Sequence, residues 1–150
     1  MKIRLIPIVQ LILIASAMLG VQKLFPSLNY QGSFNLSLFK ILALLGFGCI
    51  IAGSKEFFSY KTTTSPIDLD NATHLVTSGI YKYSRNPMYI GLALNLCGWA
   101  ALIGSFLALI GVPIFIWSIT KYQITLEESS LERQFGKSFL NYQTNVPRWL

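Results

Sequence analysis

Residues 88–120 read MYIGLALNLCGWAALIGSFLALIGVPIFIWSIT and contain no charged side chain. Only Gly104 and Ser105 separate two apolar blocks in this stretch, 88–103 and 106–120. A helix needs about 20 residues to cross a bilayer, within a range of about 17–25. The two blocks have 16 and 15 residues, just short of that range, so their flanking residues must reach into the interface. The stretch therefore predicts two short membrane-spanning helices in a tight hairpin, with a kink at Pro113 in the second.

The rest of the chain has a similar character. Hydrophobic residues make up 53% of the 150 residues and charged residues 12%, whereas a soluble domain has about 25% charged residues. Two earlier apolar blocks cover residues 5–25 and 36–53. The sequence predicts a single all-α domain over residues 1–150, an integral membrane helical bundle with about four transmembrane helices and a C-terminal cytoplasmic or interfacial helical segment. Small residues at Gly48 and Ala52 predict a close-packing face on the second helix.

The basic residues indicate an orientation. Most of the 12 Lys and Arg side chains fall near the N-terminus, between the second and third spans, or in the C-terminal tail. In a four-span topology these three regions share one side, and the positive-inside rule makes that side cytoplasmic. The net charge of +6 then reflects attraction to an anionic leaflet, and it does not indicate nucleic-acid binding.

The polar residues gather in two regions on this predicted cytoplasmic side, 62–91 and 121–150. In the first, Asn86 followed by Pro87 is typical of a helix start, because Asn caps helices well and Pro is favoured at the first position. In the second, Thr125 and Glu128 have the spacing of a capping box, which predicts a helix that restarts there. The tail after it has an aromatic face suited to the bilayer surface.

Each of these residues also has a simpler explanation. Asn86 could be only a helix cap, Glu128 only the acid of a capping box, and Arg85 only a positive-inside residue. His74 has no neighbouring second ligand, so no metal site is expected. The sequence contains no phosphate-binding loop, dinucleotide glycine pattern, Ser–His–Asp set or zinc spacing. Residue chemistry alone predicts a helical membrane protein with a polar cytoplasmic face of unassigned purpose.

The two polar regions together resemble a known family. The segments LVTSGIY (75–81) and SRNPMYIG (84–91), then Glu127-Glu128, and finally VPRWL (146–150) are similar to the isoprenylcysteine carboxyl methyltransferase family. That family is related to the membrane phospholipid N-methyltransferases. The resemblance covers roughly the last hundred residues, and it implies a methyltransferase that uses S-adenosyl-L-methionine at its cytoplasmic face.

The resemblance also implies roles for particular residues. Cofactor-binding residues would be Gly79, Tyr81, Arg85, Asn86, Tyr89, Glu127 and Glu128, and catalytic roles would fall to Arg85, Lys121, Glu127 and Glu128. Asn86 replaces a His of the eukaryotic enzymes. Lys121 stands where relatives often carry Arg, and it is a point charge without the bidentate fork of a guanidinium. S-Adenosylmethionine carries a cationic sulfonium and ammonium, which suit the glutamates and the tyrosine faces, and a carboxylate, which suits Arg85 and the N-terminus of the third helix.

The predicted acceptor is hydrophobic or arrives from the lipid phase, as in isoprenylcysteine carboxyl methylation. Alternatives within the same class are phospholipid N-methylation and S-methylation of a small thiol. A non-catalytic membrane scaffold and an oxidoreductase of the sterol-reductase type are the alternatives outside it. Membrane lipids are expected partners, whereas nucleic acid and metal are not.

Overall fold

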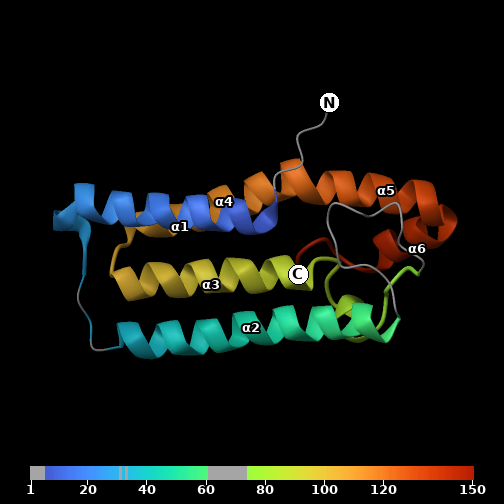
Figure 1. Cartoon of the computed structure of the whole chain (residues 1–150), viewed down its shortest axis with the longest axis horizontal. Helices are drawn as coiled ribbons and strands as arrows, with labels where there is room; N and C mark the ends of the chain where they lie inside the picture. The colour runs from blue at the N-terminus through green and yellow to red at the C-terminus, as the bar shows by residue number, and fades with distance from the viewer. Residues whose placement is uncertain (1–5, 31, 33, 61–73) are drawn as a thin grey trace.

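The computed structural model describes residues 6–30, 32, 34–60 and 74–150. Its helices lie roughly along one long axis, with α3 between α2 and the pair formed by α1 and α4 (Figure 1). The α-helical elements are α1 (Pro7–Leu24), α2 (Asn35–Ser59), α3 (Pro87–Ile103), α4 (Gly111–Ile119), α5 (Thr125–Phe135) and α6 (Lys137–Asn145). The shorter helical turns are η1 (Pro26–Leu28), η3 (Gly79–Lys82), η4 (Leu107–Ile110) and η5 (Thr120–Ile124). Within the described residues, the one β pairing is an isolated bridge between Asn29 and Ser105.

Three helical stretches are long and apolar enough to cross a membrane: Pro7–Leu24, Asn35–Ser59 and Leu107–Phe135. A fourth, Pro87–Ile103, is apolar and has 17 residues, fewer than any of these three, in line with the short third span expected from the sequence. The all-α membrane fold is therefore confirmed. Leu5 and residues 62–73, which the sequence assigned to the first span and to the cofactor region, lie outside the described residues.

The hairpin between the third and fourth spans forms where the sequence placed it. Gly104 ends α3 in the left-handed conformation, with φ of 65°, which a glycine adopts without steric cost. Its carbonyl accepts a hydrogen bond from the Tyr30 backbone N–H at 2.7 Å, which ties the hairpin to the α1–α2 connection. This end of the bundle lies opposite the end that carries α5 and α6 (Figure 1).

The fourth span differs from the prediction. Helix runs without interruption from Leu107 through η4, α4, the π-turn η5 and α5 to Phe135, so it neither ends near 120 nor restarts at a capping box. No side chain caps α5; the Thr125 hydroxyl instead donates to the Thr120 carbonyl at 2.8 Å, inside the helix. The predicted restart is therefore wrong. A π-turn inserts one residue into a helix and is often found at functional sites.

Pro113 lies inside the fourth span, as predicted. It is the third residue of α4, directly after the 3-10 turn η4. A proline lacks the backbone N–H that would donate to the preceding turn. The change from 3-10 to α-helix at Gly111 is the irregularity that the structure shows next to Pro113.

Close packing between α2 and α3 depends on glycines. A Cβ atom on Gly46 would lie 2.7 Å from the Gly91 carbonyl oxygen, and one on Gly53 would lie 2.7 Å from Met88 Cγ. At Gly48, a Cβ would meet nothing within 4 Å among the described residues, so the predicted face at Gly48 is wrong. The contact lies on the other side of α2 because helix rotation, which composition does not report, decides which small residues face α3.

The apolar core lies between α1, α3 and α4. Leu96, Ala100, Phe115 and Ile119 are at most 1% exposed, and Met18 of α1 packs against the same cluster. Many large apolar side chains on α1 and α2 remain exposed, as expected for helices that face lipid. The core holds α3 and α4 together and so fixes the ends of these helices, where the polar residues gather.

Candidate functional site

A cavity of about 340 Å³ lies at the end of the bundle where α3 begins. Its size falls within the range of about 300–1,000 Å³ that is usual for small-molecule sites. Most of its walls are apolar, with side chains from α2, α3, α5 and α6 that include Ile50, Phe57, Leu92, Leu131 and Phe139. The polar side chains that line it are Arg85, Asn86, Glu127, Glu128, His74 and the hydroxyl-bearing Tyr81, Tyr89 and Tyr142. A mostly apolar cleft with a few converging polar groups is the usual form of a binding site.

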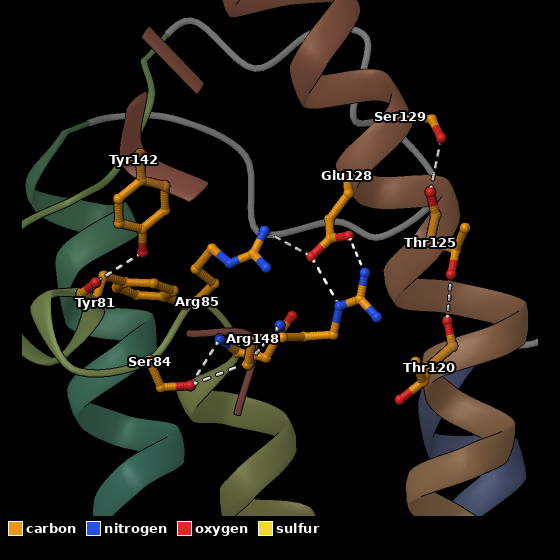
Figure 2. A network of polar contacts seen from close by, with 10 residues as sticks. Tyr81, Ser84, Arg85, Thr120, Thr125, Glu128, Ser129, Tyr142 and Arg148 are labelled. Carbon is orange, nitrogen blue, oxygen red and sulfur yellow. Dashed lines mark hydrogen bonds and ion pairs between the residues drawn. The ribbon is translucent and has the colours of Figure 1, made fainter. Parts of the chain in front are cut away.

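Three charged side chains from distant parts of the chain meet beside this cavity, and two of them line it. Arg85, just before α3, has its Nη1 atom 2.8 Å from Oε1 of Glu128 on α5. Arg148, near the C-terminus, makes a two-pronged contact with the same carboxylate, Nε to Oε1 at 3.1 Å and Nη2 to Oε2 at 2.6 Å. Figure 2 shows Glu128 between the two guanidinium groups. Hydrogen bonding to Glu128 raises the pKa of Arg148 above its ordinary value.

Arg85 and Glu128 are both well buried. Their side chains are 10% and 13% exposed, whereas Arg148 is 36% exposed. Arg85 Nε has no hydrogen-bond partner within the described part of the chain. Buried guanidinium nitrogens normally have partners, because leaving one unpaired is costly. Arg85 therefore has donor capacity left for an anionic group in the cavity.

Glu127 belongs to a second polar group on the same cavity. The Tyr89 hydroxyl and the Gln123 side-chain amide each donate to Glu127 Oε1 at 2.6 Å. Tyr89 comes from the first turn of α3 and Gln123 from the π-turn η5. The π-turn thus takes part in holding the first glutamate of the pair toward α3.

The turn η3 presents Tyr81 to the cavity. Gly79 has φ of 55°, and a Cβ atom there would collide with the carboxylate of Glu56 from α2. The same carboxylate accepts a short hydrogen bond from the Ser78 hydroxyl. Only glycine satisfies both the backbone conformation and the close approach of Glu56. The turn is therefore held against the end of α2.

Tyr81 is 6% exposed and packs edge-on against Phe57, with ring centroids 5.4 Å apart. Its carbonyl accepts a hydrogen bond from the Tyr142 hydroxyl of α6 at 2.7 Å. Burial raises the pKa of Tyr81 well above its ordinary value, with further contributions from Tyr142 and Glu127. Burial also raises the pKa of Tyr142 to about 12, although the charge of Arg85 acts in the opposite direction. Both hydroxyls therefore stay protonated and able to donate at neutral pH.

Asn86 occupies the position before α3, as the sequence predicted, but its side chain does not cap the helix. Its Nδ2 atom donates instead to the Arg148 carbonyl at 2.8 Å. The Ser84 hydroxyl supplies a local acceptor for the Asn86 backbone N–H at 3.1 Å. Asn86 therefore connects the start of α3 to the C-terminal tail while still lining the cavity.

The structure brings most of the predicted site residues together. Six of them line the one cavity: Tyr81, Arg85, Asn86, Tyr89, Glu127 and Glu128. Gly79 does not line it and acts through the backbone of η3. Lys121 does not line it either; its Nζ atom lies 4.9 Å from the Trp117 ring centre and 5.4 Å from the Tyr122 ring centre. Such cation–π contacts are typical of a side chain at a membrane interface.

Sequence reasoning missed Arg148 and Glu56. In the sequence, Arg148 is one of the basic residues of the tail, and its place in the motif VPRWL is the one available signal. Glu56 lies between the second predicted span and the polar region 62–91, and its spacing to Ser78 carries no pattern. Both act through contacts with residues more than 19 positions away, Arg148 with Glu128 and Glu56 with Ser78. Among the described residues, no group of three or more His, Cys, Asp or Glu could hold a metal ion.

A second hollow of about 620 Å³ adjoins the cavity and shares His74, Leu75 and Tyr142 with it. Its further lining consists of Phe135 and of the polar, uncharged Thr77, Ser138, Asn141 and Asn145. His74 is held there by stacking on Tyr60, with ring centroids 4.3 Å apart. This hollow gives the apolar cavity a polar flank on the side of α6.

Residues 36–138 match a family of known proteins described as phospholipid methyltransferase. The protein-S-isoprenylcysteine O-methyltransferase of Schizosaccharomyces pombe is 37% identical over 78 residues, which are 51% of this chain and 33% of that enzyme. Protein-S-isoprenylcysteine O-methyltransferase B of Arabidopsis thaliana is 25% identical over 126 residues, 82% of this chain and 62% of that enzyme. The chain thus spans less than two thirds of the length of either enzyme. An uncharacterized protein of Haemophilus influenzae is 44% identical over 63 residues, which are 42% of this chain and 100% of that protein. No solved structure matches the chain.

Proposed function

The chain belongs to the phospholipid methyltransferase family, and on that basis we propose that it is an integral membrane methyltransferase of the isoprenylcysteine carboxyl methyltransferase type. It transfers a methyl group from S-adenosylmethionine to a hydrophobic, lipid-phase acceptor. The observation that carries the proposal is the cavity of about 340 Å³ at which Arg85, Glu127 and Glu128 converge among apolar walls.

The residues present fit S-adenosylmethionine. Arg85 has an unpartnered Nε atom within the described part of the chain, which suits the cofactor's carboxylate. The carboxylate of Glu127 and the rings of Tyr81 and Tyr89 suit its cationic ammonium and sulfonium groups. When bound, the cofactor supplies a methyl group that is already activated for displacement.

Methyl transfer requires that donor and acceptor be positioned, and it does not require a catalytic triad. Methyl transfer is an in-line displacement, so holding donor and acceptor in line and excluding water supplies most of the catalysis. The apolar walls formed by Leu92, Leu131 and Phe139 keep water out. An acceptor carboxylate is itself the nucleophile and needs no general base. Arg85, Glu127 and Glu128 would orient the reactants, whereas Lys121 does not line the cavity and packs on Trp117.

The chemical class of the methyl acceptor is inferred from the side chains that line the cavity. Side chains of Ile50, Phe57 and Leu92 from the membrane helices favour an isoprenyl or acyl chain over a sugar or nucleotide. The distribution of basic residues favours a cytoplasmic position for the cavity and both termini. On this proposal, the acceptor reaches the cavity from the lipid phase and the cofactor from the cytosol.

Two measurements on the detergent-solubilised protein test the proposal. S-Adenosylmethionine and S-adenosylhomocysteine should raise the unfolding temperature, whereas NADPH should not. In a panel of acceptors, an S-farnesylated cysteine analogue should be methylated, and a phospholipid amine and a small soluble thiol should not. Stabilisation by NADPH alone would indicate an oxidoreductase, and stabilisation by none of the three would indicate a scaffold. Turnover with the thiol alone would overturn the lipid-phase acceptor.

A further inference from the structure

The C-terminal tail is fastened to the loop that precedes α3. The Arg85 backbone N–H donates to the Pro147 carbonyl at 3.0 Å. The Arg148 carbonyl accepts from Asn86 Nδ2 at 2.8 Å and from the Ser84 hydroxyl at 3.3 Å. These contacts use only the backbone of the tail, so they fix the position of Arg148 whatever its side chain is.

From this fixed position, the Arg148 side chain contacts Glu128 from outside the cavity lining. Arg148 does not line the cavity, whereas Glu128 and Arg85 do. Both oxygens of Glu128 are engaged by Arg148, and one of them also meets Arg85 (Figure 2). A bidentate arginine–carboxylate pair is the stronger and more directional arrangement, so Glu128 is held chiefly by Arg148.

The charges of Arg85, Glu128 and Arg148 do not cancel. Two guanidinium groups share one carboxylate, so these three side chains together carry one positive charge, while Glu127 lines another part of the cavity. Without Arg148, Arg85 and Glu128 would form a neutral pair, and Glu128 would be free to turn fully toward Arg85. The positive charge of this group therefore depends on a residue that does not touch the cavity.

We propose that Arg148 is a positioning residue that holds Glu128 and so leaves Arg85 available to bind the carboxylate of the methyl donor. The inference rests on the proposed function, because it takes the donor to be S-adenosylmethionine. Arg148 would act only on the part of the ligand that carries the carboxylate. It should matter little for the nucleoside, the sulfur or the ammonium group.

The test compares two ligands by calorimetry on the purified full chain in detergent. One is S-adenosylhomocysteine; the other is its decarboxylated form, which keeps the ammonium group and lacks the carboxylate. We expect Arg148→Gln to weaken binding of the first about tenfold, the scale of one charge-assisted contact, and to leave binding of the second unchanged. Arg148→Lys should recover part of the loss, because it restores the charge without the fork. Arg133→Gln, which removes an arginine of α5 that does not line the cavity, is the matched control and should bind both ligands as the wild type does.

The outcomes are distinguishable. Equal weakening of both ligands by Arg148→Gln would assign Arg148 a purely structural role and overturn the inference, as would no weakening of either. If Arg148→Gln does not fold, Arg148→Lys carries the same comparison, and an equal effect on both ligands would again overturn the inference. If the wild type binds neither ligand, the proposed function fails and the inference fails with it. If the wild type binds both and only the carboxylate-bearing ligand responds to the substitution, both are supported.

Discussion

Replacing Gly79 with alanine should disturb the site although Gly79 does not line the cavity. The residue has φ of 55°, and a Cβ atom there would collide with the Glu56 carboxylate. Forcing an L-residue into the left-handed region costs about 1–2 kcal/mol. Displacing Glu56 would also break its hydrogen bond from Ser78, and a hydrogen bond to a charged group contributes about 1.5–3 kcal/mol. The free energy of unfolding should therefore fall by about 2.5–5 kcal/mol.

A double-mutant cycle separates the two contributions. Glu56→Ala alone removes the hydrogen bond and should cost about 1.5–3 kcal/mol. In that background the collision is gone, so adding Gly79→Ala should cost only the conformational term of about 1–2 kcal/mol. The double variant should then be about as stable as Gly79→Ala alone, a coupling of about 1.5–3 kcal/mol.

The assay is SDS titration of the protein in mixed micelles, followed by tryptophan fluorescence. Gly48→Ala is the matched control, because a Cβ atom there meets nothing within 4 Å among the described residues; the change should stay within about 1 kcal/mol. S-Adenosylhomocysteine affinity should fall with Gly79→Ala, since η3 carries Tyr81 into the cavity. Strict additivity of the two single variants would refute the reasoning.

Three further predictions concern the site and the topology. Glu128→Ala leaves two arginines without their shared carboxylate, so we expect the free energy of unfolding in the same titration to fall by about 3–5 kcal/mol and S-adenosylhomocysteine binding to be lost. Wild-type stability of this variant would contradict a buried network. Tyr142→Phe removes the hydroxyl that donates to the Tyr81 carbonyl, so a loss of about 0.5–1.5 kcal/mol is expected, and an unchanged unfolding curve would mean that this hydrogen bond contributes nothing. In a cysteine-free background, Lys23→Cys should react with an impermeant maleimide added outside intact cells and Lys137→Cys should not; the reverse pattern would contradict a cytoplasmic site.

The sequence determined that this protein lies in a lipid bilayer and which segments of the chain form its membrane helices. Helix formation and preference for lipid depend on composition and on neighbours along the chain, so the apolar blocks predicted the spans. The start of α3 at Pro87 and the hairpin at Gly104 followed from local backbone preferences of Pro and Gly. The candidate site residues came mainly from a family resemblance, because residue chemistry by itself left each of them a simpler explanation.

Tertiary structure decided which helix faces and which side chains contact one another. Whether the helix continues past residue 120, and whether Gly46 or Gly48 meets α3, depends on contacts with other helices, and an apolar pattern fits either outcome. The grouping of Arg85, Glu128 and Arg148 joins residues from three separate segments, and no spacing in the sequence encodes the distances between them. Lys121, six residues before Glu127 in the sequence, packs instead on Trp117, because helix geometry places it on another face.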